Sequence, residues 1–110
     1  MNGRRRRLLL AAGAAAALLA SRAQPTRAVP PRTVTIDAFE FKPGALTVER
    51  GDTIVWRNDD PVPHTVTAPG AFDSGSIAAG ASWEHVAAAT GTFDYACAFH
   101  PTMKGRLIVG

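Results

Sequence analysis

The amino-acid sequence predicts an all-β sandwich or barrel, and three observations lead to this fold class. From residue 33 to the C-terminus, no run of ten or more residues has apolar side chains at helical spacing. Short segments rich in β-branched and aromatic residues recur instead, and Gly, Pro, Asn and Asp divide them. Seven such segments in fewer than 80 residues leave room for one small core, which excludes a multidomain enzyme.

The first 23 residues have the composition of an export signal. Four arginines at residues 4–7 precede a thirteen-residue apolar run from Leu8 to Ala20, and Ser21-Arg22-Ala23 fits cleavage after Ala23. The run is short for a membrane span, so we expect a periplasmic or secreted mature chain that does not cross the membrane. Arg5-Arg6-Arg7-Leu8-Leu9 resembles a twin-arginine signature, which leaves both the Sec and the twin-arginine routes open. An uncleaved anchor is the alternative.

The net charge changes sign once this segment is set apart. The whole chain has 12 basic and 9 acidic residues, whereas residues 24–110 hold seven basic and all nine acidic ones, a net charge of −2. These scattered basic residues form no cluster that would bind nucleic acid. Residues 24–32, with three prolines, predict a flexible lead-in, and we expect the folded domain over residues 33–110.

The first four strands are expected over residues 33–41, 46–49, 53–58 and 64–68. In the first, Val34 and Ile36 share one face while Phe39 and Phe41 share the other, so the buried set changes phase. A bulge or a sheet-crossing bend is therefore expected near residues 37–38. Turn-forming Pro-Gly, Arg-Gly-Asp and Asn-Asp-Asp-Pro sequences bound the second and third strands.

The last three strands are expected over residues 82–87, 92–98 and 105–109. The small, polar, glycine-containing stretch 69–80 before them predicts a loop across one edge of the sandwich. In the sixth strand Phe93, Tyr95 and Cys97 share parity, so the Cys97 side chain should point inward from the strand end. Because Cys97 is the only cysteine of the chain, it has no partner for an internal disulfide.

A candidate metal site follows this strand directly. Cys97, His100 and Met103 form a Cys-x2-His-x2-Met spacing within one short loop. Thiolate, imidazole and thioether together suit copper, which accepts soft sulfur as Cu(I) and imidazole as Cu(II). His64 is the candidate for a further ligand from another loop. Zinc accepts the same Cys and His residues, but a thioether is a poor zinc ligand, so the spacing favours one copper ion.

The chain resembles the cupredoxins, the type 1 or blue copper proteins, and its short ligand loop is most similar to that of the amicyanin group. Besides the Cys-His-Met loop, the resemblance rests on residues 39–43, 54–58, 63–64, 91–95 and 105–109. It implies a Greek-key β-sandwich of seven to eight strands. It also implies a trigonal copper plane of His64, Cys97 and His100, with Met103 as a long axial ligand.

By the same resemblance, the protein is expected to carry one electron between redox proteins while copper cycles between Cu(I) and Cu(II). We expect a monomer that is not an enzyme, because four protein ligands leave no open position for a substrate. The donor and the acceptor would dock transiently on apolar residues around the exposed edge of His100, namely Pro63, Phe99 and Pro101. Ordinary loop packing is the alternative for these residues.

One departure from the family pattern follows the first histidine, where Thr65 stands in place of a frequent asparagine. Its backbone N–H can still reach the thiolate and its hydroxyl can bridge the two ligand loops, although the hydrogen bonding and the reduction potential can differ. His85, remote in sequence from any soft ligand, is interpreted as structural. Four acidic residues are interpreted as solvated charges of turns and faces: Asp59, Asp60, Asp73 and Glu84.

Two other functions stay open at this point. A copper-binding protein for delivery or storage uses similar ligands without needing fast electron transfer. A metal-free adhesion or interaction module needs only the sandwich, with Cys97 and Met103 as ordinary core residues. The visible spectrum and redox kinetics distinguish an electron carrier from a copper delivery or storage protein. Copper that is bound to the protein after growth with sufficient copper excludes the metal-free module.

Overall fold

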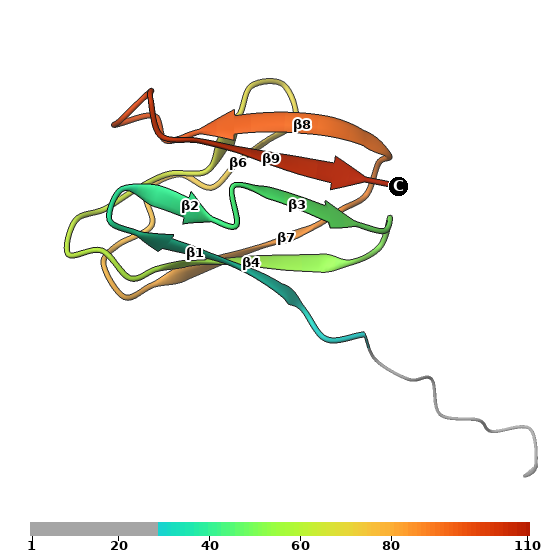
Figure 1. Ribbon diagram of the computed structural model, residues 1–110, viewed down its shortest axis with the longest axis horizontal. Coiled ribbons are helices and arrows are strands. Elements are labelled where there is room, and N and C mark those ends of the chain that lie inside the picture. Colours follow the sequence, from blue (N-terminus) through green and yellow to red (C-terminus); the bar gives the residue numbers. More distant parts are fainter. Residues whose placement is uncertain (1–28) are drawn as a thin grey trace, which may run out of the picture.

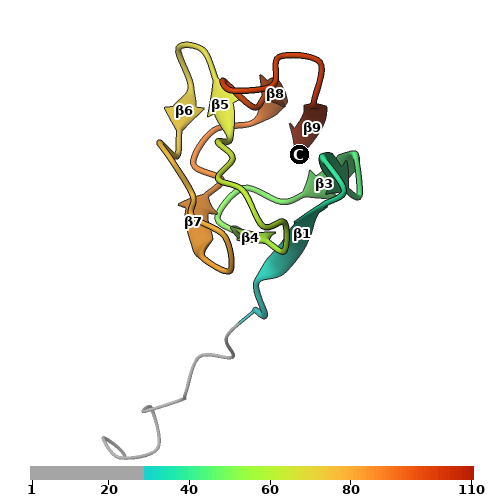
Figure 2. The ribbon, with the colours of Figure 1, turned by 90° about the vertical axis from the view of Figure 1, so that its left-hand side faces the viewer.

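The computed structural model describes residues 29–110, and it arranges them as two β-sheets packed face to face (Figures 1 and 2). The all-β sandwich expected from the sequence is therefore confirmed. The export signal and most of the lead-in expected before residue 33 lie outside the described residues. No helix within residues 29–110 is long and apolar enough to cross a membrane.

Nine strands form the two sheets, whose spatial orders are β2-β1-β4-β7 and β3-β9-β8-β5-β6. Their bounds are β1 (Arg32–Asp37), β2 (Glu40–Lys42), β3 (Ala45–Val48), β4 (Thr53–Asn58), β5 (Thr67–Ala68), β6 (Phe72–Asp73), β7 (Ser82–Val86), β8 (Gly91–Ala96) and β9 (Lys104–Val109). Each sheet contains one parallel pair, with Val34 opposite Trp56 in β1 and β4 and Leu46 opposite Leu107 in β3 and β9. These four side chains are buried between the sheets, as the period of two in a strand requires.

The segment expected as one bent strand is a hairpin of β1 and β2. The chain reverses at Ala38 and Phe39, whose φ angles of 52° and 61° are both left-handed, so that Asp37 pairs with Glu40. Two positive φ angles are what a tight two-residue hairpin turn needs. The turn explains the phase change in the sequence, and it corrects the expected bulge: Phe41 is buried, whereas Phe39 lies exposed at the turn.

The region between β4 and β7 also differs from expectation. The strand expected over residues 64–68 is reduced to β5, while His64 makes only an isolated bridge to Ile77. Between these points Val66 pairs with Ser74, whose hydroxyl accepts the Val66 N–H at 2.7 Å and whose own N–H donates to the Val66 carbonyl at 2.9 Å. A side-chain acceptor thus replaces one rung of the ladder, and the stretch expected as a loop contributes β6.

The antiparallel pair of β8 and β9 carries the predicted ligand loop at its end. Phe93, Tyr95 and Cys97 alternate inward along β8 and just beyond it, as predicted. Tyr95 lies opposite Gly105 of β9, where any Cβ would overlap the Tyr95 ring, so glycine leaves room for that ring to reach Phe41 of β2. The β8–β9 loop and the β1–β2 turn lie at the same end of the sandwich (Figure 1).

Candidate metal centre

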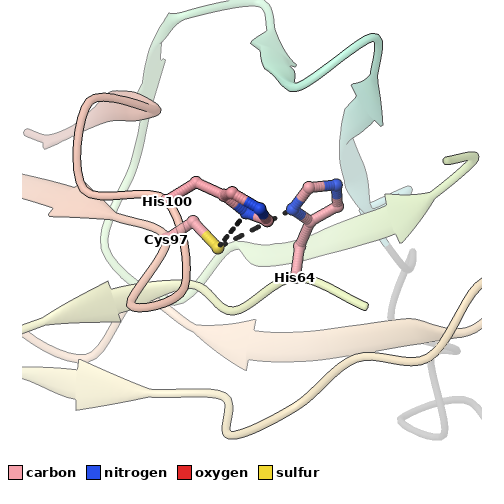
Figure 3. A group of neighbouring side chains, drawn as sticks. All are labelled: His64, Cys97 and His100. Carbon is pink, nitrogen blue, oxygen red and sulfur yellow. Dashed lines mark hydrogen bonds between the residues drawn. The ribbon is translucent and has the colours of Figure 1, made fainter. Parts of the chain in front are cut away.

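Three of the four predicted ligands come together at this end of the sandwich, as Figure 3 shows. His64 lies beyond β4 on one loop, and Cys97 and His100 lie on the β8–β9 loop. The Cys97 sulfur is 3.7 Å from His64 Nδ1 and 3.6 Å from His100 Nδ1, and the three atoms all lie within 4.8 Å of one another. The predicted convergence of these side chains is therefore confirmed.

The spacing and burial of these atoms fit a single metal ion. Metal bonds of about 2.3 Å to sulfur and about 2.0 Å to nitrogen that meet at an angle of about 110–120° place the two donor atoms about 3.5–3.7 Å apart. That separation matches both sulfur–nitrogen distances given above. Cys97 and His64 are fully buried and His100 is partly buried. One soft sulfur with two imidazoles is a donor set that suits copper.

His64 is oriented by a buried carboxylate. Its Nε2 lies 2.8 Å from Oδ2 of Asp60, a residue that is only 5% exposed. An imidazole that donates Nε2–H to a carboxylate keeps the lone pair of Nδ1 free, and here Nδ1 faces the Cys97 sulfur. The interpretation of Asp60 as a solvated charge is therefore wrong, because its carboxylate is buried against the ring of His64.

The same carboxylate accepts two backbone hydrogen bonds from the β1–β2 turn. The N–H groups of Ala38 and Phe39 donate to its two oxygens at 2.7 and 2.9 Å. Burial raises the pKa of Asp60, but the hydrogen bonds from Phe39, His64 and Ala38 outweigh burial, and the pKa is lowered overall. Asp60 is therefore ionised at neutral pH.

Asn58, at the end of β4, fixes the loop that leads to His64. It is fully buried, and its side-chain amide donates to the carbonyls of Val62 and Ile77 at 2.9 and 3.0 Å. Its Oδ1 accepts the N–H of Asp60 at 2.9 Å. Because the Asn58 side chain forms hydrogen bonds with backbone groups on both sides of the loop, the segment that leads to His64 keeps its conformation without regular sheet structure.

Thr65 joins the two ligand loops. Its backbone N–H donates to the Cys97 sulfur at 3.3 Å, and its hydroxyl accepts the N–H of Ala98 at 2.7 Å. Both contacts expected from the sequence are confirmed. The Thr67 hydroxyl donates to Asp73 at 3.2 Å and lies 2.9 Å from the Thr65 hydroxyl, so the Thr65 O–H donates to Thr67 while its oxygen accepts from Ala98.

The comparisons with known proteins agree with this geometry. The family model described as "Cupredoxin-like domain" matches residues 8–109. The chain belongs to the cupredoxin-like family. It is 28% identical over 82 residues to amicyanin-alpha of Methylorubrum extorquens, a match that covers 69% of each chain. It is 30% identical over 86 residues to amicyanin of Paracoccus versutus, which covers 69% of this chain and 62% of that relative.

Solved structures extend the likeness to the fold. A reduced, Cu(I) form of an amicyanin variant superposes with a TM-score of 0.71 at 26% identity, over 76% of this chain and 86% of the other. The reduced state of a second amicyanin variant gives a TM-score of 0.70 at 27% identity over the same shares. The predicted resemblance to cupredoxins, and within them to amicyanin, is therefore confirmed.

The short ligand loop of this cupredoxin is held by its own backbone. Cys97 N–H donates to the Met103 carbonyl at 3.0 Å, His100 N–H to the Cys97 carbonyl at 3.2 Å, and Met103 N–H to the His100 carbonyl at 2.9 Å. The Met103 side chain is buried at the end of this loop. Its role as the axial ligand stays a prediction.

The remaining predicted residues of this cupredoxin lie around or away from the three donors. Pro63, beside His64, and Phe99 and Pro101, on the β8–β9 loop, are exposed, and Phe99 is 53% exposed. His85 lies on β7 beside the rings of Phe72 and Trp83, at centroid distances of 4.4 and 5.6 Å, and is not part of the donor group. This position agrees with the structural role inferred for His85.

One residue at the site has no signal in the sequence that marks it. The Phe39 ring meets both imidazoles edge-on, at centroid distances of 5.1 Å from His64 and 4.8 Å from His100. Its position in the β1–β2 hairpin was not expected, because the sequence pattern placed it inside a strand. Only the fold brings this turn onto the donor group.

Proposed function

We propose that this chain is a blue copper electron-transfer protein in which His64, Cys97 and His100 hold one copper ion and Met103 is the weak axial ligand. The observation that carries the proposal is the convergence of one buried sulfur and two imidazole nitrogens within 4.8 Å. When bound, copper supplies a one-electron step between Cu(I) and Cu(II). The amicyanin relatives, whose solved structures include a Cu(I) form, support this choice of metal.

The role of the protein is to keep the donor atoms in place in both oxidation states. His64 is fixed through Asp60, and Cys97 is fixed through the N–H of Thr65 and the carbonyl of Met103. Each hydrogen bond joins a ligand to a segment that is itself held to the sheets. Donors that hardly move require little rearrangement when the charge of the site changes, and this favours fast electron transfer.

The apolar residues around His100 are the proposed docking surface for a redox donor and acceptor. His100 is partly exposed, and the neighbouring Pro63, Phe99 and Pro101 are exposed and uncharged. Weak electron-transfer complexes bury little surface and exchange quickly, which suits a small apolar contact. We propose that the protein acts as a monomeric carrier and not as an enzyme.

We further propose that residues 1–23 direct export, by the Sec or the twin-arginine route, and that the domain of residues 33–110 works in the periplasm or outside the cell. The arginine block and the apolar run after it support export. N-terminal sequencing of the secreted protein tests the cleavage site after Ala23.

Redox kinetics of the copper-loaded mature protein test the function. A carrier should be reduced and reoxidised reversibly by voltammetry, and its electron self-exchange, measured by NMR line broadening in mixtures of both states, should be rapid. His85→Ala is the matched control, because that imidazole lies outside the donor group and its loss should leave both results unchanged. Slow or irreversible cycling with copper retained would instead indicate copper delivery or storage.

A further inference from the structure

Phe39 occupies an unusual place for a large aromatic side chain. It is 46% exposed, it lies in a left-handed turn with φ of 61°, and Ala38 before it is also left-handed at 52°. Bulky residues rarely adopt this region, and they persist there only where the surroundings hold them. The ring nevertheless has a defined position, because its edge or face contacts both imidazoles at nearly perpendicular angles of 89° and 86°.

The Asp60 carboxylate holds the turn in this conformation. Its oxygens accept the N–H groups of Ala38 and Phe39, the two left-handed residues, which lie 22 and 21 positions away in the sequence. Oδ2, which takes the Phe39 N–H, also takes Nε2 of His64. The buried Asp60 side chain is therefore hydrogen-bonded both to the ring of His64 and to the turn that carries Phe39.

His100 lacks a comparable anchor. His64 has a hydrogen bond on the nitrogen that faces away from the sulfur, whereas within residues 29–110 the Nε2 of His100 has no hydrogen-bond partner. Apart from the 3.6 Å contact of its Nδ1 with the Cys97 sulfur, the orientation of the His100 ring depends on packing. The perpendicular contact with Phe39 at 4.8 Å is the closest aromatic contact of this ring among these residues. Perpendicular aromatic pairs have a preferred geometry, so this contact can orient the ring.

We propose that Asp60 is a positioning residue for both imidazole donors, acting directly on His64 and, through the turn and the ring of Phe39, on His100. The inference rests on the proposed function only in taking these two rings as copper ligands. It extends that function, because the β1–β2 turn, which lies outside both ligand loops, then helps to orient the His100 ring before any metal binds.

The direct action of Asp60 on the His64 ring is tested by Asp60→Asn in the metal-free protein. Asparagine keeps the size of the side chain, but its amide nitrogen faces either the Ala38 N–H or the Phe39 N–H and His64, so the hydrogen bonds to the turn and to His64 cannot all remain. Because an asparagine oxygen that faces His64 would preserve the Nε2–H tautomer, Asp60→Ala, which removes both oxygens, is measured beside it. The matched control is Asp59→Asn, which changes the neighbouring exposed acid and affects only the pair with Arg57. Nitrogen-15 NMR should show His64 as the single Nε2–H tautomer in the wild type and the control, and a mixture of tautomers in Asp60→Ala.

The action on the His100 ring through Phe39 is tested by Phe39→Leu, with Phe99→Leu as the matched control. Both phenylalanines are exposed to a similar extent, but among the described residues the Phe99 ring forms no aromatic pair with either imidazole. In the metal-free protein, Phe39→Leu should abolish the ring-current shift of the His100 protons and leave that ring in several orientations. Asp60→Asn should have the same effect on His100, and Phe99→Leu and Asp59→Asn should not.

Two results would overturn the inference. One is a single Nε2–H tautomer of His64 that survives in Asp60→Ala, and the other is an ordered His100 ring in Phe39→Leu. If Asp60→Ala does not fold, as circular dichroism would show, Phe39→Leu decides alone, because it leaves the carboxylate intact. With copper bound, Asp60→Asn and Phe39→Leu should each shift the reduction potential more than their controls. Because the NMR experiments need no metal, their failure is distinct from a failure to bind copper.

Discussion

Replacement of Thr65 by valine tests how the two ligand loops are joined. Valine keeps the shape of the side chain but removes the hydroxyl that accepts the Ala98 N–H at 2.7 Å. A polar group left without its partner costs about 1–3 kcal/mol when it is buried. Thr65 is buried but Ala98 lies at the surface, where water partly replaces the lost acceptor. We therefore expect the free energy of unfolding to fall by about 1–2 kcal/mol.

Thermal and urea unfolding of the metal-free protein measure this loss without a contribution from copper binding. For a domain of this size, each kcal/mol lowers the midpoint by about 4–8 °C. The control is Thr67→Val, which removes the neighbouring hydroxyl but leaves the bond between Ala98 and Thr65 in place. Thr65→Ser should restore most of the stability, because serine keeps the acceptor.

Copper loading adds a second readout. The contact between Thr65 and the Cys97 sulfur comes from the backbone N–H, so it survives in Thr65→Val and the visible band should remain. Equal stability of Thr65→Val and the wild type would refute the bridge between the loops. Loss of the visible band in this variant would show that the hydroxyl, and not the backbone, supports the thiolate.

Three further substitutions test other parts of the account. Met103→Leu should retain copper but change the reduction potential, because the axial thioether is the weakest proposed ligand; loss of copper on dialysis would contradict this. Gly105→Ala should lower the free energy of unfolding by about 1–3 kcal/mol, since its Cβ would overlap the buried Tyr95 ring, and an unchanged urea midpoint would contradict it. Burial lowers the pKa of His85 from the ordinary 6.5, so the unfolded chain binds the proton first and stability should fall as pH drops below about 6.5. The thermal midpoint of His85→Gln should fall less over that range, and an equal fall in both proteins would contradict the role of this residue.

The strands and the ligand loop were accessible to sequence reasoning because their signals are local. Alternation along β8 placed Cys97 inward, and the spacing from Cys97 to His100 and Met103 lies within one loop. His64 was found because the site needs a further ligand, and because this histidine follows a turn at the start of a predicted strand and matches the family pattern. Strand bounds were less accurate where the partner is a side chain, as with the Ser74 hydroxyl that replaces a ladder rung.

The residues that escaped prediction depend on contacts between distant segments. Asp59 and Asp60 are identical and adjacent in sequence, yet one pairs with Arg57 at the surface and the other is buried against His64. Nothing local distinguishes them. Phe39 has the strand-like parity of its neighbours, and only the turn held by Asp60 places it at the site. In both cases tertiary hydrogen bonds override the local pattern.

The visible and electron paramagnetic resonance spectra of the copper-loaded mature protein, beside those of Cys97→Ser, test the central claim most directly. If the Cys97 sulfur and the nitrogens of His64 and His100 share one copper ion, the wild type should show an intense visible thiolate-to-copper band and a narrow copper hyperfine splitting. Both should disappear in Cys97→Ser. A pale protein, or a spectrum that this substitution leaves unchanged, would show that the sulfur is not a ligand and would contradict the account.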